Sequence, residues 1–103
     1  MGFFFLMPKK TLNIGLIGYL FMGKAHSNGW RQAPRFFDMK HGVRLHTICG
    51  RNAAAVEKAR KQYGWDHAAT DWREVVANPE IDVIDINTPN DSHAEIAIAA
   101  ARA

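Results

Sequence analysis

The chain has little cysteine, no block of like charges and no long hydrophobic run. Cys49 is the single cysteine among 103 residues, which excludes an internal disulfide framework and a cysteine-based zinc site. It also fits a reducing compartment such as the cytoplasm. Thirteen Lys and Arg against ten Asp and Glu leave a net charge of only +3, with the basic residues scattered. We therefore expect neither a nucleic acid partner nor a bound metal ion.

The apolar N-terminus is too short to cross a membrane. Residues 1–7 read MGFFFLM, whereas a transmembrane helix needs about 20 apolar residues. The segment also lacks the charged region and the small-residue cleavage site of a signal peptide. We interpret residues 1–10 as a leader, with Met7 as an alternative start, ahead of one domain over residues 11–103. A weak membrane contact of this leader is the alternative interpretation.

Short apolar strands alternate with helical stretches along the predicted domain. The alternation requires crossover connections, and these connect parallel strands with helices packed on both faces of the sheet. The sequence therefore predicts an α/β fold, a Rossmann-like doubly wound parallel sheet with the order β-α-β-α-β-α-β-α. The predicted strands are residues 12–17, 43–49, 68–70 and 81–86.

Capping residues mark the ends of the predicted helices, and the last helix shows where the domain is incomplete. That helix is apolar nearly all round, which is typical of a helix inside a larger body. We therefore expect a domain cut short at its C-terminal end, with self-association through an uncovered sheet edge and this helix. The capping signals are Asn52 and Gly64 around residues 53–63, and capping boxes at residues 71–74 and 92–95.

The junction after the first strand carries glycines at a spacing typical of nucleotide binding. In a G-x-G-x-x-G turn the first glycine permits the bend, the second admits the pyrophosphate and the third lets helix and strand pack closely. The phosphates rest on N–H groups at the helix start. Gly18 and Gly23 fit the first and third positions, and Leu20 occupies the middle one. The alternative is a glycine turn that only packs the helix on the sheet.

Three segments carry a more specific signal than the glycines alone. They are IGLIGYLFMGKAHS at residues 14–27, TDWREVV at residues 70–76 and DVIDINTPNDSH at residues 82–93. Together they resemble the Gfo/Idh/MocA family of NAD(P)-dependent oxidoreductases, named after glucose–fructose oxidoreductase and inositol dehydrogenase. The resemblance implies the NAD(P)-binding Rossmann domain of an enzyme that transfers hydride to or from a sugar, a polyol or a related hydroxylated molecule.

The resemblance also implies a cofactor site built from two loops. One loop holds the pyrophosphate and the other lines the nicotinamide side of the cleft, at the carboxyl ends of the strands, where such folds bind ligands. His93 is either a substrate-side or cofactor-side residue or an ordinary helix-start residue. The loop residues are Gly18, Tyr19, Leu20, Phe21, Met22 and Gly23 for the pyrophosphate, and Thr88, Pro89 and Asn90 for the nicotinamide side.

Two departures from the family pattern bear on activity. Leu20 stands where the family usually has a small residue, and its side chain would crowd the pyrophosphate. The chain also stops before the family's Glu-Lys-Pro motif, whose lysine takes part in catalysis, and before the substrate domain. We therefore assign no catalytic residue and expect the chain alone to be inactive. The alternatives are a non-catalytic remnant or nucleotide-sensing module, and another Rossmann-type binder such as a methyltransferase.

The end of the second strand bears on the choice of nicotinamide cofactor. An acidic residue there selects NAD through the ribose hydroxyls, whereas room and an arginine accept the 2′-phosphate of NADP. Gly50 lies near the acidic position and Arg51 follows it. This pattern favours NADP, with NAD as the alternative if Arg51 is a solvated loop cation.

Several other residues are interpreted as structural. Cys49 is expected to be a buried small hydrophobe, and the three tryptophans are expected in the core or at a domain contact. His26 is interpreted as a surface-helix histidine, with a position facing the cofactor as the alternative. Asp82 and Asp85 are three residues apart, which sends them to opposite faces of a strand and argues against a catalytic carboxylate pair.

Overall fold

The computed structural model describes residues 11–18, 21–36, 42–88 and 90–103. Four strands and four helices alternate over these residues, which confirms the predicted α/β order. The leader at residues 1–10 lies outside the described residues, and the domain limits stay a prediction. The elements are β1 (Thr11–Ile17), α1 (Phe21–Phe36), β2 (Gly42–Cys49), α2 (Ala53–Tyr63), β3 (His67–Ala69), α3 (Trp72–Ala77), β4 (Val83–Ile86) and α4 (Asn90–Arg102).

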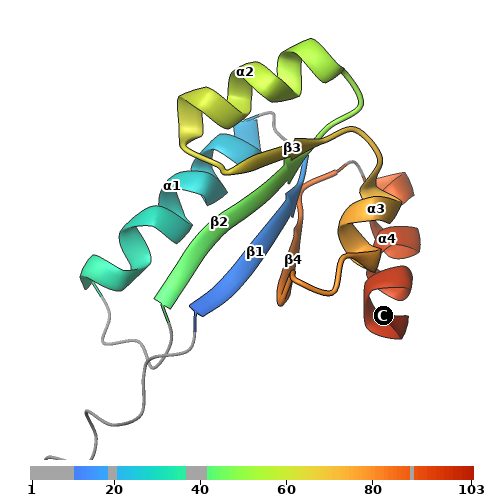
Figure 1. The fold of residues 1–103 in the computed structure, drawn as a ribbon. Coiled ribbons are helices and arrows are strands. Elements are labelled where there is room, and N and C mark those ends of the chain that lie inside the picture. The colour runs from blue at the N-terminus through green and yellow to red at the C-terminus, as the bar shows by residue number, and fades with distance from the viewer. Residues whose placement is uncertain (1–10, 19–20, 37–41, 89) are drawn as a thin grey trace, which may run out of the picture.

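The strands form one parallel sheet with helices on both faces. Its order is β3-β2-β1-β4, so β1 lies between β2 and β4. Figure 1 shows α1 and α2 on one face and α3 and α4 on the other. The chain thus crosses from one side of β1 to the other between β3 and β4. This crossing is the switch point beyond which open α/β sheets bind their ligands.

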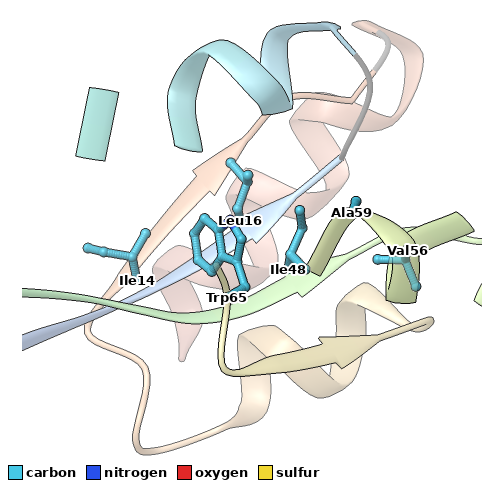
Figure 2. Close-up of a cluster of buried hydrophobic side chains, with 6 residues drawn as sticks. All are labelled: Ile14, Leu16, Ile48, Val56, Ala59 and Trp65. Carbon is cyan, nitrogen blue, oxygen red and sulfur yellow. The ribbon is translucent and has the colours of Figure 1, made fainter. Parts of the chain in front are cut away.

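Two hydrophobic clusters, one on each face, hold the layers together. The cluster under α1 and α2 contains Ile14, Leu16, Ile48, Val56, Ala59 and Trp65, and Figure 2 shows Trp65 lying among the strand side chains. The cluster under α3 and α4 contains Ile17, Cys49, Val75 and Ile96. Burial on both faces explains why β1 reads as a nearly continuous apolar run. Trp30 packs against the first cluster and Trp72 against the second, which confirms the structural interpretation of the tryptophans.

A bulge interrupts the pairing of β1 with β2. Ile14 pairs with Leu45, but Gly15 pairs with Thr47, so His46 is an extra residue on β2. Strict alternation would place Leu45 and Cys49 on the same face. The extra residue instead brings Leu45 and Ile48 to the first cluster and Cys49 to the second. His46 is itself buried, and its Nε2 lies 3.2 Å from the Glu80 carboxylate.

The caps of α2 and α3 follow the sequence signals. The Asn52 side chain accepts a hydrogen bond from the Ala55 N–H at 2.9 Å, and Gly64 closes α2 in the left-handed region at φ 80°. The Asp71 side chain accepts from the Arg73 N–H at 3.0 Å at the start of α3. Both N-caps and the glycine C-cap are therefore confirmed.

Two predicted boundaries are wrong. α4 begins at Asn90, two residues before Ser92, so the expected cap at Ser92 lies inside the helix. A proline is favoured at the start of a helix, and the Thr-Pro-Asn sequence therefore competes with Ser92 as a start signal. β4 begins at Val83 rather than Ile81, because the Ile81 N–H bonds back to Asn78 O at 3.2 Å in a turn.

Candidate nucleotide-binding site

The turn after β1 can be made only with glycine at position 18. Gly18 has φ +103°, a backbone conformation that residues with a Cβ rarely adopt. A Cβ at this position would also lie 2.7 Å from the carbonyl oxygen of Asn87. The Gly18 N–H donates to Cys49 O at 2.8 Å. The carboxyl ends of β1, β2 and β4 therefore meet at this turn.

Gly23 lets the first turn of α1 lie directly against Gly18. A Cβ on Gly23 would collide with the Gly18 carbonyl oxygen. The Gly23 carbonyl accepts a hydrogen bond from Ser27 Oγ at 2.7 Å, and Ser27 Oγ accepts one from Trp65 Nε1 at 2.9 Å. The first turn of α1 contains no acidic residue, so its positive end is not neutralised by a carboxylate of its own. This start of a helix can accept an anion.

The loop after β4 lies beside the glycine turn and contains an unpaired buried hydroxyl. The Asn87 N–H donates to Ile17 O at 2.8 Å, which fixes the loop against the end of β1. Thr88 follows, and its buried Oγ1 has no hydrogen-bond partner among the described residues. Leaving such a group unpaired costs about 1–3 kcal/mol. A polar ligand beside this loop would give this hydroxyl a partner.

The end of β2 presents a cation and no carboxylate. The Gly50 N–H donates to Ala69 O at 3.0 Å, and Arg51 is exposed just before the α2 cap. An arginine can bind an anionic group through charge-assisted hydrogen bonds. The described residues at this strand end therefore offer positive charge rather than a carboxylate.

Cys49 lies beneath this edge but is not a reactive thiol. Its side chain is buried, as expected from the sequence. Burial raises the pKa of the thiol to about 11, and the negative charges of Asp71 and Glu74 add to the increase. Because the thiolate is the nucleophile, a thiol with a raised pKa is inert near neutral pH.

The comparisons with known proteins agree with this geometry. Residues 12–103 match the model of the Gfo/Idh/MocA family, described as an oxidoreductase family with an NAD-binding Rossmann fold. The chain belongs to this family. The structure described above is the fold of its NAD-binding Rossmann domain.

Individual relatives of the family support the assignment. Levoglucosan dehydrogenase of Pseudarthrobacter phenanthrenivorans is 42% identical over 95 residues, covering 91% of this chain and 24% of that protein. A solved complex of levoglucosan dehydrogenase with NADH and L-sorbose has a TM-score of 0.88 at 42% identity, over 90% of this chain and 25% of that one. An oxidoreductase domain protein from Kribbella flavida has a TM-score of 0.87 at 52% identity, over 90% of this chain and 24% of that one. The chain thus spans about a quarter of the length of these relatives.

The structure brings together part of the site that the Gfo/Idh/MocA resemblance implies. Gly18 and Gly23 lie against each other, and Thr88 follows the residue that touches Gly18. Tyr19, Leu20 and Pro89 lie outside the described residues, so the crowding expected from Leu20 stays a prediction. Phe21 and Met22 form the first turn of α1, and Asn90 begins α4. The roles of all these residues in cofactor binding remain predictions.

The two candidate histidines differ in their surroundings. His93 is exposed in the first turn of α4, and its role stays a prediction. His26 does not simply face solvent from the surface of α1, as the sequence suggested. Its Nδ1 lies 2.8 Å from Asp85 Oδ2 on β4. Sequence reasoning missed this pair, although both residues fall in segments that carry the family resemblance.

The described residues bear on three further expectations, which concern a metal site, a membrane-spanning helix and a carboxylate pair. Within residues 11–18, 21–36, 42–88 and 90–103, no group of three or more His, Cys, Asp or Glu residues is arranged to hold a metal ion. In the same part of the chain, no helix has the length and apolar character needed to span a bilayer. Asp82 accepts a hydrogen bond from the Asn13 N–H, whereas Asp85 lies against His26, so the two carboxylates have separate partners.

Proposed function

We propose that this chain binds a nicotinamide dinucleotide at the turn after β1, as part of an oxidoreductase that acts on a sugar, a polyol or a related hydroxylated molecule. The observation that carries the proposal is the contact of Gly18 with Asn87, beside the unpaired hydroxyl of Thr88. A relative whose solved structure contains NADH and L-sorbose supports the choice of ligand and of substrate class.

The two loops would divide the cofactor between them. The pyrophosphate would lie against the turn from Gly18 to Gly23, where N–H groups at the start of α1 attract an anion. Thr88, Pro89 and Asn90 would line the nicotinamide side, with Thr88 Oγ1 bonded to the ligand. When bound, the nicotinamide supplies the hydride acceptor or donor. We assign no proton-transfer residue within residues 11–103, so the chain alone is proposed to bind the nucleotide without turnover.

The cofactor preference is proposed to be NADP, with NAD as the alternative. Gly50 stands where an acidic residue would contact the ribose hydroxyls, and Arg51 is exposed beside it. A charge-assisted hydrogen bond between the guanidinium and a 2′-phosphate contributes about 1.5–3 kcal/mol. A difference of that size is sufficient to determine the preference.

We also propose how the chain associates and in which compartment it resides. Ile98 on α4 is 53% exposed, and β4 forms one edge of the described sheet, so we propose self-association through this side. The reduced thiol of Cys49 suits the cytoplasm.

Calorimetric titration with NADH and NADPH tests the nucleotide site, and two glycines of α1 provide a matched pair of variants. Gly23→Ala places a Cβ against the Gly18 carbonyl, whereas Gly29→Ala meets no atom within 4 Å. We expect the parent to bind, Gly23→Ala to lose about tenfold or more in affinity, and Gly29→Ala to retain it within about twofold. A parent chain that binds neither nucleotide would refute the proposal, and equal affinities in both variants would place the nucleotide elsewhere.

A further inference from the structure

One carboxylate joins the helix of the glycine turn to the strand that leads into the second loop. Asp85 lies on β4 with its side chain only 15% exposed. Its Oδ2 accepts hydrogen bonds from His26 Nδ1 at 2.8 Å and from Trp30 Nε1 at 2.9 Å, both on α1. Because an ionised carboxylate only accepts, the proton of a neutral His26 is fixed on Nδ1. Two turns of α1 are therefore bonded to one residue of the sheet.

The same carboxylate also reaches the loop after β4. Asp85 Oδ1 accepts from Asn87 Nδ2 at 3.3 Å. The Asn87 carbonyl lies against Gly18, and the Gly18 carbonyl lies against Gly23 at the start of α1. The contacts thus form a closed ring that runs from Asp85 through α1, the glycine turn and Asn87 back to Asp85.

We propose that Asp85 is a positioning residue for nucleotide binding, which sets the placement of the glycine turn. The inference rests on the nucleotide site proposed above and deepens it. Apolar packing of α1 on the sheet is non-directional and does not by itself select one rotation of the helix. Hydrogen bonds to one fixed carboxylate are directional, and they determine where the first turn of α1 lies. Asp85 acts through His26, Trp30 and Asn87 and does not itself contact the ligand.

The experiment compares two carboxylate-to-amide variants, one just before β4 and one near the end of β4. Asp85→Asn keeps the shape of the side chain but turns one acceptor into a donor. Asp82→Asn is the matched control, because Asp82 accepts from the Asn13 N–H at 2.8 Å away from the glycine turn. We expect Asp85→Asn to weaken NADH binding about tenfold, equivalent to ~1.4 kcal/mol, in calorimetry of folded protein. Asp82→Asn should stay within about twofold of the parent.

Two further readouts separate positioning from a general loss of stability. If Asp85 acts through the glycine turn, Asp85→Asn lowers the affinity for ADP-ribose, which contains the pyrophosphate, by the same factor as the affinity for NADH. The affinity for AMP falls much less. The double variant with His26→Ala then loses no more NADH affinity than Asp85→Asn alone, because both changes break the same contact. Equal losses for AMP and ADP-ribose would overturn the positioning role.

The outcomes also distinguish this inference from the function on which it rests. A parent that binds neither NADH nor NADPH overturns the nucleotide site and the positioning role together. A parent that binds NADH, with Asp85→Asn and Asp82→Asn binding equally well, overturns the positioning role alone. If Asp85→Asn fails to fold, the Trp30→Phe variant takes its place in the comparison, because it removes one donor to the same carboxylate. Trp30→Phe should then lower the affinity for ADP-ribose more than the affinity for AMP. An unchanged ratio of the two affinities would reject the role of Asp85.

Discussion

The Trp65 indole N–H donates a hydrogen bond to Ser27 Oγ at 2.9 Å, across 38 residues of sequence. Trp65 belongs to the cluster under α1 and α2, and Ser27 in turn donates to the carbonyl of Gly23. Both Ser27 and Trp65 are buried. The hydrophobic core and the start of the nucleotide-facing helix are therefore parts of one connected structure.

Removing this indole donor is expected to destabilise the fold. Trp65→Phe leaves part of a cavity and deprives Ser27 of a partner, so we expect a loss of about 2 kcal/mol in the free energy of unfolding. Trp72→Phe is the control, because Trp72 is only partly buried beside the second cluster. Urea denaturation measures both losses, and a loss for Trp65→Phe no greater than that for Trp72→Phe would contradict the role of the hydrogen bond.

Removing the hydroxyl of Thr88 is expected to change stability and binding in opposite directions. Thr88→Val deletes the unpaired buried oxygen, so the free energy of unfolding without nucleotide should rise by about 1 kcal/mol. The affinity for NADH should fall about fivefold, because the ligand loses a hydrogen bond. Thermal melts and calorimetry measure the two effects. Thr11→Val, at the exposed far end of β1, should leave the affinity unchanged. A Thr88→Val variant with full NADH affinity would exclude a contact between Thr88 and the cofactor.

Arg51 is expected to discriminate between the two nicotinamide cofactors. Arg51→Ala should weaken NADPH binding about tenfold through the lost charge-assisted hydrogen bond, and should leave NADH binding within about twofold. The comparison is made by titration with both nucleotides. Lys58→Ala, an exposed change on α2, controls for the removal of one positive charge. Equal losses for NADH and NADPH in Arg51→Ala would rule out a contact with the 2′-phosphate.

The buried thiol predicts how stability depends on alkaline pH. The pKa of Cys49 is raised from 9.0 to about 11, so the folded state favours the protonated thiol. The resulting stabilisation is complete below about pH 9, and it is lost as the pH rises through the folded-state value near 11. Denaturant melts between these values should show a steeper loss for the parent than for Cys49→Ala. Parallel pH profiles for the two proteins would contradict the raised pKa.

Local signals in the sequence were sufficient for the order of the elements and for most of the helix ends. Asn52 and Gly64 act through their own neighbours, so their caps can be read from a few residues. The start of α4 was misplaced because two start signals lie within a few residues, at Asn90 and at Ser92. The residue at which α4 begins depends on the path of the chain after β4, and that path is set by tertiary contacts rather than by local sequence.

The contacts of the candidate site were only partly predictable. The need for glycine at positions 18 and 23 follows from the spacing, because backbone packing at a strand–helix turn is general. The pairing of His26 with Asp85 spans 59 residues and depends on how α1 lies across β4. No local pattern encodes that relation. The unpaired state of Thr88 Oγ1 is likewise visible only once its surroundings are known.

The extra residue at His46 determines the chemistry of the sulfur three positions later. If His46 were paired like its neighbours instead of bulged, Ile48 and Cys49 would exchange the sides of the sheet on which they lie. The thiol would leave the neighbourhood of Asp71 and Glu74, whose negative charges raise its pKa. Deleting His46 would by contrast leave Cys49 on its present side, because Thr47 would then follow Leu45 in regular alternation. An extra residue that stays unpaired in the middle of β2 thus sets the acidity of a side chain that it does not touch.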